Sequence, residues 1–182
     1  MLPCAIHPLE SADACRELAR HDHWRIEVSD PTLRLFTAWH RLAPLPGGKW
    51  LFSKLVGWAA PYTGSIGARV EVLEPGHVRI SLRERRAVRQ HLGSVHAVAL
   101  VNLAEVTSGL AMLGAAGPGV RGIVTGLRIE YQKKARGLLL AESFATPPVV
   151  TEPTDAEVTA TITDAEGDVV AVATVSWRLA PR

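Results

Sequence analysis

The feature that constrains this chain most is a stretch at about residues 94–113 that is apolar on every side of a helix. Its apolar residues do not form the single stripe of a surface helix, so the stretch has to be enclosed. Glu105 is the only acidic residue in it, and a carboxylate there is costly unless it is paired, protonated or facing a cavity. No apolar run approaches the roughly 18–20 residues that span a bilayer. We therefore expect no membrane span and a helix enclosed by the protein itself.

Segments with a period of two, typical of β-strands, lie on both sides of that helix. Residues 66–72 and 78–83 alternate around a turn at 74–77, which predicts a β-hairpin. Six mostly antiparallel strands around one helix make an α+β architecture. The other four strands are expected at about residues 123–133, 138–146, 156–163 and 168–179.

The alternation also predicts which side chains share a face. The last strand carries Val and Ala on both faces, so we expect it in the interior of the sheet. The first strand of the hairpin is expected to place its alternating apolar side chains on one face: Ile66, Ala68, Val70 and Val72. The strand near residue 123 is expected to bury Ile123, Thr125, Leu127, Ile129 and Tyr131.

Residues 1–60 read as a helical extension that precedes a sheet domain at residues 61–182. Helices are expected at about residues 10–20 and 49–59, and a further one begins at Ser29-Asp30-Pro31, a cap residue followed by proline in the first turn. In the helix at 49–59 one apolar face is expected to cap the sheet or line an apolar pocket: Leu51, Leu55 and Trp58.

Composition points to an oligomer and excludes several classes of protein. The 182 residues are 47% hydrophobic but only 5% aromatic, and so much small apolar surface is more than a lone domain of this size is expected to bury. With 20 Lys and Arg against 18 Asp and Glu, the chain lacks the charge of a nucleic-acid binder.

No signal peptide or disulfide framework is recognisable, so we expect a cytoplasmic protein. We expect no metal site, because the spacings match no closed zinc site among Cys4, His7, Cys15, His21 and His23.

A polar loop at residues 90–97 leads into the apolar helix, and Glu105 follows two and a half turns further on. A helix N-terminus offers unpaired N–H groups and positive potential, which suit a carbonyl oxygen or a developing oxyanion. Nine residues separate His96 from Glu105, about 900° of rotation and roughly 13 Å of rise. One copy of the helix cannot bring both ends to one carbonyl. Two copies related by a two-fold axis can, which predicts a site at a dimer interface.

Three segments resemble those of a known superfamily. Gly93-x-x-His96-Ala97 followed by Leu103-Ala104-Glu105 is similar to the G-x-x-H-G-G…L-A-[DE] signature of the PaaI-like and 4-hydroxybenzoyl-CoA-thioesterase-like hotdog proteins. Tyr131-Gln132-Lys133-Lys134-Ala135-Arg136-Gly137 resembles their Y-x-[RK]-x-A-x-G strand-turn. With Ala60-Pro61-Tyr62, the chain resembles most the DUF4442 branch, over roughly residues 55–180. The resemblance implies the hotdog fold, a six-stranded sheet wrapped around one central helix, as a homodimer or tetramer.

The resemblance also implies an activity, hydrolysis of an acyl-CoA or acyl-carrier thioester, with no cofactor besides the coenzyme A moiety of the substrate. It implies that Glu105 is the nucleophile or general base and that the Ala97 N–H is the oxyanion donor. Gln90 would orient the carbonyl, and His96 would position the helix entry. Ala97 replaces the first Gly of the H-G-G pair, and Gly109 lacks a hydroxyl that some active relatives carry.

Each candidate also has a plainer structural interpretation. Glu105 can be a buried acid paired with Asn102, His96 or a partner chain, and His91 and His96 can be cap or core residues. The basic residues form either a rim for coenzyme A phosphates or a solvated face with Glu84 as partner: Arg79, Arg83, Arg85, Arg86, Arg89, Lys133, Lys134 and Arg136. The candidate substrate-binding residues are Asn102, Ser108, Lys133, Lys134 and Arg136. The alternative functions are a non-catalytic acyl-CoA or lipid-binding hotdog protein and a structural dimer.

Overall fold

The structure is a computed structural model that describes residues 30–182. The helix expected at residues 10–20 lies outside the described residues. The described elements are α3 (Pro31–Leu42), α4 (Gly48–Ala59), α5 (Pro61–Ser65), β1 (Arg69–Glu74), β2 (His77–Arg83), the short 3-10 helix η1 (Arg86–Val88), α6 (Ala97–Ala116), β3 (Val120–Tyr131), β4 (Leu138–Phe144), β5 (Thr154–Thr163) and β6 (Val169–Pro181).

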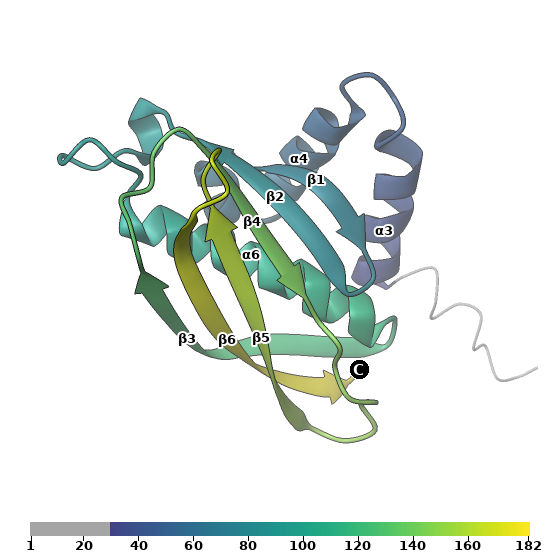
Figure 1. Ribbon diagram of the computed structural model, residues 1–182. Coiled ribbons are helices and arrows are strands. Elements are labelled where there is room, and N and C mark those ends of the chain that lie inside the picture. Colours follow the sequence, from purple (N-terminus) through teal and green to yellow (C-terminus); the bar gives the residue numbers. More distant parts are fainter. Residues whose placement is uncertain (1–29) are drawn as a thin grey trace, which may run out of the picture.

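One antiparallel sheet of six strands curves around the long helix α6 (Figure 1). The strand order is β1-β2-β4-β5-β6-β3, so β6 is an interior strand and β1 and β3 are the two edges. The predicted α+β architecture, the hairpin of β1 and β2 and the interior position of the Val- and Ala-rich last strand are therefore confirmed.

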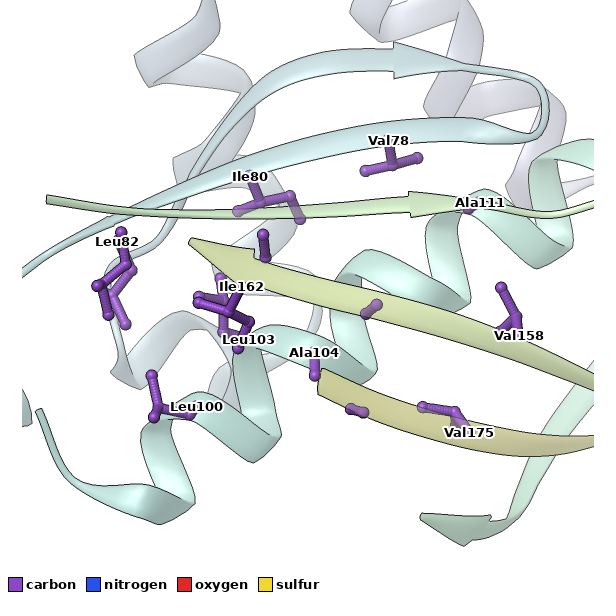
Figure 2. Packing of buried hydrophobic residues seen from close by; sticks show 14 of the residues in the cluster. Val78, Ile80, Leu82, Leu100, Leu103, Ala104, Ala111, Val158, Ile162 and Val175 are labelled. Atoms are coloured by element: carbon purple, nitrogen blue, oxygen red, sulfur yellow. The ribbon is translucent and has the colours of Figure 1, made fainter. Parts of the chain in front are cut away.

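The core lies between α6 and the concave face of the sheet (Figure 2). Leu103, Ala104 and Ala111 of α6 have no exposed surface, and strand residues such as Ile80 and Val175 pack with them. The helix begins at Ala97, three residues later than expected, because His96 is its N-cap. The prediction of an enclosed, all-round apolar helix is confirmed.

The expectation that no apolar run approaches the length of a bilayer span is wrong for α6: by length and composition it is the one described helix that is apolar enough to cross a bilayer. In the fold, however, 56% of its most apolar window is buried by other parts of the chain. The sheet thus provides the apolar surroundings that the helix needs.

Two β-bulges change the faces that simple alternation predicts. The register shifts between Val70 and Val72 of β1, so that Val70 and Leu73 are the buried residues of that strand. A second shift lies between Val124 and Gly126 of β3. An extra residue in one strand reverses the side-chain alternation beyond it.

The predicted face of β3 is accordingly half wrong. Leu127 and Ile129 are partly buried against the core as expected. Ile123, before the bulge, is 66% exposed, and Thr125 and Tyr131 are exposed as well. In β1, the expected alignment of Val70 with Val72 is lost for the same reason.

The helices α3 and α4 pack onto the same core as the sheet. Trp39 of α3 and Phe52 of α4 are buried and meet edge to face, with their ring centroids 5.1 Å apart. Both side chains belong to the hydrophobic cluster formed by α6 and the strands. The boundary between an extension at 1–60 and a domain at 61–182 stays a prediction.

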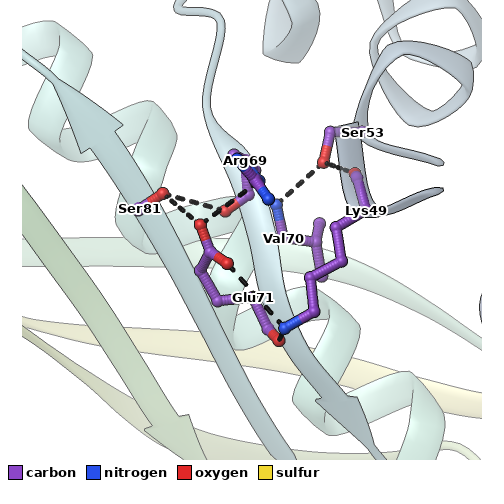
Figure 3. Close-up of polar contacts among 6 residues, drawn as sticks. All are labelled: Lys49, Ser53, Arg69, Val70, Glu71 and Ser81. Carbon is purple, nitrogen blue, oxygen red and sulfur yellow. Dashed lines mark hydrogen bonds and ion pairs between the residues drawn. The ribbon is translucent and has the colours of Figure 1, made fainter. Parts of the chain in front are cut away.

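The helix α4 also covers the outer edge of β1 (Figure 3). An edge strand presents unpaired backbone groups that invite pairing with another strand. Here the Ser53 hydroxyl accepts a hydrogen bond from the Val70 N–H (2.9 Å), and the Lys49 ammonium donates to the Glu71 carbonyl (2.7 Å). Edge β1 is therefore protected, whereas β3 has no strand on its outer side within residues 30–182.

The apolar face expected to cap the sheet or line a pocket does not cap the sheet, and of its three residues only Trp58 lines a groove. Leu51, Leu55 and Trp58 do share one side of the helix, but they are 43%, 48% and 83% exposed. Phe52 and Val56 make the contacts with the core instead. Helical spacing identifies residues that share a face, but it does not say which of two apolar faces is turned inward.

Asp30 joins the start of α3 to two distant parts of the chain. Its Oδ1 accepts hydrogen bonds from the Thr32 and Leu33 N–H groups (2.7 and 3.4 Å), which confirms the predicted cap at this helix start. Its Oδ2 accepts from the Gly119 N–H (2.9 Å) and lies 3.6 Å from Arg182. Burial alone would raise the pKa of Asp30, but these hydrogen bonds hold it below its ordinary value.

We predict that Asp30→Ala lowers the free energy of unfolding by about 2–3 kcal/mol, because a helix cap is lost and the Gly119 N–H loses its acceptor. The pKa of Asp30 is lowered on folding, so its contribution is complete above the unfolded-state value and is lost as the pH falls through the folded-state value. Urea unfolding at neutral and acidic pH measures both effects. The matched control is Glu152→Ala at an exposed site, and an equal loss in both variants would contradict the prediction.

Candidate functional site

The N-terminus of α6 opens onto the surface with its first donor free. His96 is the N-cap, and its Nδ1 accepts a hydrogen bond from the Val98 N–H (3.1 Å). The His96 carbonyl accepts from Ala99 and Leu100. The N–H of Ala97 has no acceptor among residues 30–182. It is therefore free to donate to a ligand, and its role as an oxyanion donor stays a prediction.

The loop before α6 and the first residue of α6 are hydrogen-bonded to the end of β3 and to the turn that follows it. The Val95 N–H donates to the Ala135 carbonyl (2.9 Å), and the Tyr131 hydroxyl donates to the Ala97 carbonyl (3.3 Å). The His96 N–H donates to the Val88 carbonyl (2.8 Å). The residues that resemble the Y-x-[RK]-x-A-x-G motif thus have a structural role, because they fix where α6 begins.

Gln90 lies in this loop, in a turn closed by a hydrogen bond from its N–H to the Ser94 carbonyl (2.9 Å). Its side-chain amide donates to the Ser94 hydroxyl (2.9 Å), and Gly93 in the same turn has a φ of +72°. The amide is therefore held beside the helix entry. His91 is exposed in the same loop and does not belong to the core.

Glu105 is half-buried on α6, and its carboxylate has no ion pair or hydrogen bond with any described residue. Two of the partners considered for it are engaged elsewhere. His96 caps the helix, and the Asn102 side-chain amide donates to the Tyr62 carbonyl (3.0 Å). Burial raises the pKa of Glu105 above its ordinary value, because no donor or cation offsets the loss of hydration.

Among the described residues, two more buried polar groups lack partners, one on α6 and one on β6, whose Trp177 ring packs against Gly109 of α6. Asn102, Glu105 and Gly109 follow one another at i, i+3 and i+7. The Asn102 Oδ1 and the Trp177 Nε1 are buried and have no hydrogen-bond partner within residues 30–182. A Cβ on Gly109 would come within 3.0 Å of the Trp177 ring. The indole thus fills the space where a side chain at position 109 would lie, which explains the missing hydroxyl.

Ser108 is fully buried and donates its hydroxyl hydrogen bond to the Glu105 carbonyl (2.9 Å). This local bond occupies its donor within the helix. The assignment of Ser108 to substrate binding stays a prediction, and the buried position gives it no direct support.

The two halves of the predicted site remain far apart within one chain. Because α6 is unbroken from Ala97 to Ala116, Glu105 lies about 13 Å along the axis from His96. A cavity of about 220 Å³ beside the helix entry contains His96 and Asn102 in its wall, but not Glu105. Tyr62 and Arg89 also line this cavity; the sequence pointed to Tyr62 only through the Ala60-Pro61-Tyr62 segment.

Several of the basic residues are already paired. Lys133 contacts both Asp164 and Asp168, which raise the pKa of its ammonium well above the ordinary value. Arg79 pairs with Glu142 and Arg89 with Glu84, at 2.7 Å each. Among the described residues, five of the predicted rim form no ion pair: Arg83, Arg85, Arg86, Lys134 and Arg136. Of these, Arg85 donates a hydrogen bond to the Ser65 carbonyl (3.1 Å).

Glu84 links Arg89, in the loop between β2 and α6, to the turn after β3. Its Oε2 accepts from the Gly137 N–H (2.7 Å), and this bond together with Arg89 holds the pKa of Glu84 below its ordinary value. The interpretation of Arg89 as part of a solvated face with Glu84 as partner therefore fits the structure.

The part of the chain from residue 30 onward contains no group of three or more His, Cys, Asp and Glu side chains that could hold a metal ion. The cysteines and histidines considered for zinc lie outside the described residues: Cys4, His7, Cys15, His21 and His23.

Comparison with known proteins identifies a family and a fold. The family model described as "Domain of unknown function (DUF4442)" matches residues 48–179. The solved genomics protein APC5556 is 26% identical with a TM-score of 0.70, and the match covers 81% of this chain and 98% of that one. No curated protein matches the chain.

Two further solved structures are named as thioesterases. PA5026 from Pseudomonas aeruginosa, a protein of unknown function and probable thioesterase, is 24% identical over 76% of this chain and 97% of its own, with a TM-score of 0.66. A hypothetical thioesterase from Streptococcus pneumoniae, solved with coenzyme A, is 21% identical over 63% of this chain and 90% of its own, with a TM-score of 0.55. At these identities the likeness shows the hotdog fold.

We predict that Glu105→Gln raises the free energy of unfolding at neutral pH, because it removes a carboxylate that is desolvated without compensation. The folded-state pKa is raised, so the native protein binds more protons than the unfolded chain, and the gain vanishes as the pH falls below the unfolded-state pKa. Urea unfolding of both proteins across this pH range measures the difference. Glu166→Gln, on an exposed turn, is the control. A loss of stability in Glu105→Gln would instead reveal a donor or cation from another chain.

Proposed function

The chain belongs to the DUF4442 family and has the hotdog fold, and from this premise we propose that it hydrolyses an acyl-CoA-type thioester between two copies of the chain. The observation that carries the proposal is Glu105, a half-buried carboxylate without a partner on an otherwise apolar helix. An acid kept in this costly position, with a raised pKa, is suited to take up and release a proton.

The proposed reaction uses Glu105 as a general base. Its carboxylate takes a proton from a water molecule, whose oxygen attacks the thioester carbonyl carbon. The C–S bond then breaks, the carboxylic acid forms, and the departing thiolate receives the proton. Direct attack by Glu105 to form an anhydride that water then hydrolyses is the nucleophilic version of the same role.

The oxyanion formed in this step needs hydrogen-bond donors. The free Ala97 N–H at the positive end of α6 is suited to stabilise it, and the amide of Gln90 is held nearby by Ser94. Since Ala97 and Glu105 of one chain are too far apart to reach one carbonyl, we propose that a second copy supplies the donor. His96 positions this helix entry by capping it.

Two features support assembly with a second copy. Strand β3 is 12 residues long and forms a sheet edge without a further strand among the described residues, so the same strand of another copy can extend the sheet. The exposed Ile123 and Val98 add apolar surface on β3 and at the start of α6.

The coenzyme A moiety is proposed to lie along the cations that remain without ion pairs at the turn after β3. Lys134 and Arg136 are exposed there, and Arg is well suited to grip a phosphate. Lys133 is less available, because Asp164 and Asp168 hold it. The related Streptococcus pneumoniae protein, solved with coenzyme A, supports this class of ligand.

We predict that a panel of acyl-CoA esters includes one from which the protein releases free thiol. Glu105→Gln is expected to lower kcat by about 10²–10⁴-fold, the usual contribution of a positioned acid–base group. Glu166→Gln should keep full turnover. Turnover that survives in Glu105→Gln would remove this mechanism, and tight binding without any turnover would support the non-catalytic alternative.

Mixing two inactive variants tests the shared site. Ala97→Pro removes the proposed donor at the first position of α6, where proline is well tolerated, and His96 before it already has the extended backbone that proline requires. Alone, Ala97→Pro and Glu105→Gln should each be inactive. Their co-expressed mixture should regain about one quarter of the activity, because half of the two-fold symmetric dimers then contain one intact site of two. No recovery, or a stable monomer by light scattering, would contradict a site between copies.

A further inference from the structure

One face of α4 is apolar and exposed, and the fold does not use it. Leu51, Leu55 and Trp58 recur at i, i+4 and i+7 and are 43%, 48% and 83% exposed. Trp50, at the border of this face, is 56% exposed. Apolar side chains gathered in this way on a surface mark an interaction site.

Cations predominate in the sequence around this face. From residue 31 to residue 70 the sequence contains five Lys and Arg and no Asp or Glu. Lys54 lies on the exposed face itself, between Trp50 and Trp58 along the helix, with its ammonium 5.8 Å from the centre of the Trp50 ring. We call Trp50, Leu51, Lys54, Leu55 and Trp58 together the α4 face.

A groove beside the α4 face has a positive balance of charge, since its charged lining residues are Lys54, Arg69 and Arg83 against Glu71 alone. It has a volume of about 680 Å³, and Trp50, Lys54 and Trp58 line it on the helix side. Arg69 and Arg83 line it on the side of the sheet, together with apolar side chains such as Leu138. Cationic and apolar groups therefore continue from the helix onto the neighbouring strands.

These observations distinguish between the possible occupants. A second copy of the same face would bring like charges together, which disfavours a self-contact. A protein partner needs a surface shaped to fit a projecting helix. A fluid bilayer fits any convex apolar face, with Trp rings at the level of the headgroups and Lys amines at the phosphates.

We propose that the α4 face binds the surface of lipid bilayers that contain anionic phospholipids, so that the protein associates with membranes without crossing them. The apolar side chains enter the boundary between headgroups and acyl chains, and Lys54 contacts the phosphates. This property is independent of the proposed thioester hydrolysis and of Glu105.

The test is sedimentation of the full chain with vesicles of phosphatidylcholine, alone or mixed with phosphatidylglycerol. Binding is expected only to the anionic vesicles and should weaken as salt is added. Trp58→Ser should lower the affinity about tenfold or more through lost apolar contact, and Lys54→Gln about fivefold through one lost charge.

Matched controls change the same chemistry elsewhere. Val149→Ser removes an apolar side chain that is 90% exposed, and Arg121→Gln removes an exposed charge on β3; both should bind as the unaltered chain does. No sedimentation with either kind of vesicle, or sedimentation unchanged by Trp58→Ser and Lys54→Gln, would overturn the proposal. Self-association in light scattering that Trp58→Ser abolishes would assign the face to a second copy and would overturn it too.

Discussion

A helix without a polar side can exist in water only if something encloses it, and this requirement organises the whole molecule. The six strands provide the enclosure by curving around α6 (Figure 1). Small side chains make this possible, because Ala104 and Ala111 on the helix and Ala160 and Ala173 on the strands allow close approach. The abundance of Ala and Val and the scarcity of aromatic residues follow from the same geometry.

The enclosure also gives Glu105 its chemical character. Within the apolar surroundings of α6 a carboxylate loses hydration, and no described side chain compensates it. Among residues 30–182, the buried Asn102 Oδ1 on α6 and the Trp177 Nε1 on β6 also lack partners. Uncompensated polar groups in apolar surroundings are expensive to maintain, which is why we assign the face of α6 with Asn102 and Glu105 to a ligand or a second chain rather than to the fold.

The two edges of the sheet differ in whether their backbone groups are covered, and this difference determines which surfaces are available for contact with other molecules. The side chains of Ser53 and Lys49 satisfy the backbone of β1, whereas β3 is open within residues 30–182 (Figure 3). The same helix that closes β1 turns Leu51, Leu55 and Trp58 outward. One edge is thus available to another copy of the chain, and the opposite side presents a basic and apolar surface.

Local sequence determined several elements, because each depends on neighbours within a few residues. These are the apolar helix, the hairpin, the cap at Asp30 and the isolated acid. Tertiary structure decided the rest. The bulge in β1 turns Val72, and the bulge in β3 turns Ile123, away from the face that simple alternation predicts, because register depends on the strand opposite. On α4, Phe52 rather than Leu51 packs into the core. Lys133 forms ion pairs with Asp164 and Asp168. Both outcomes depend on contacts between residues far apart in the sequence. Spacing along one helix showed that Ala97 and Glu105 lie apart, while only the folded chain showed that both lack a partner among the described residues.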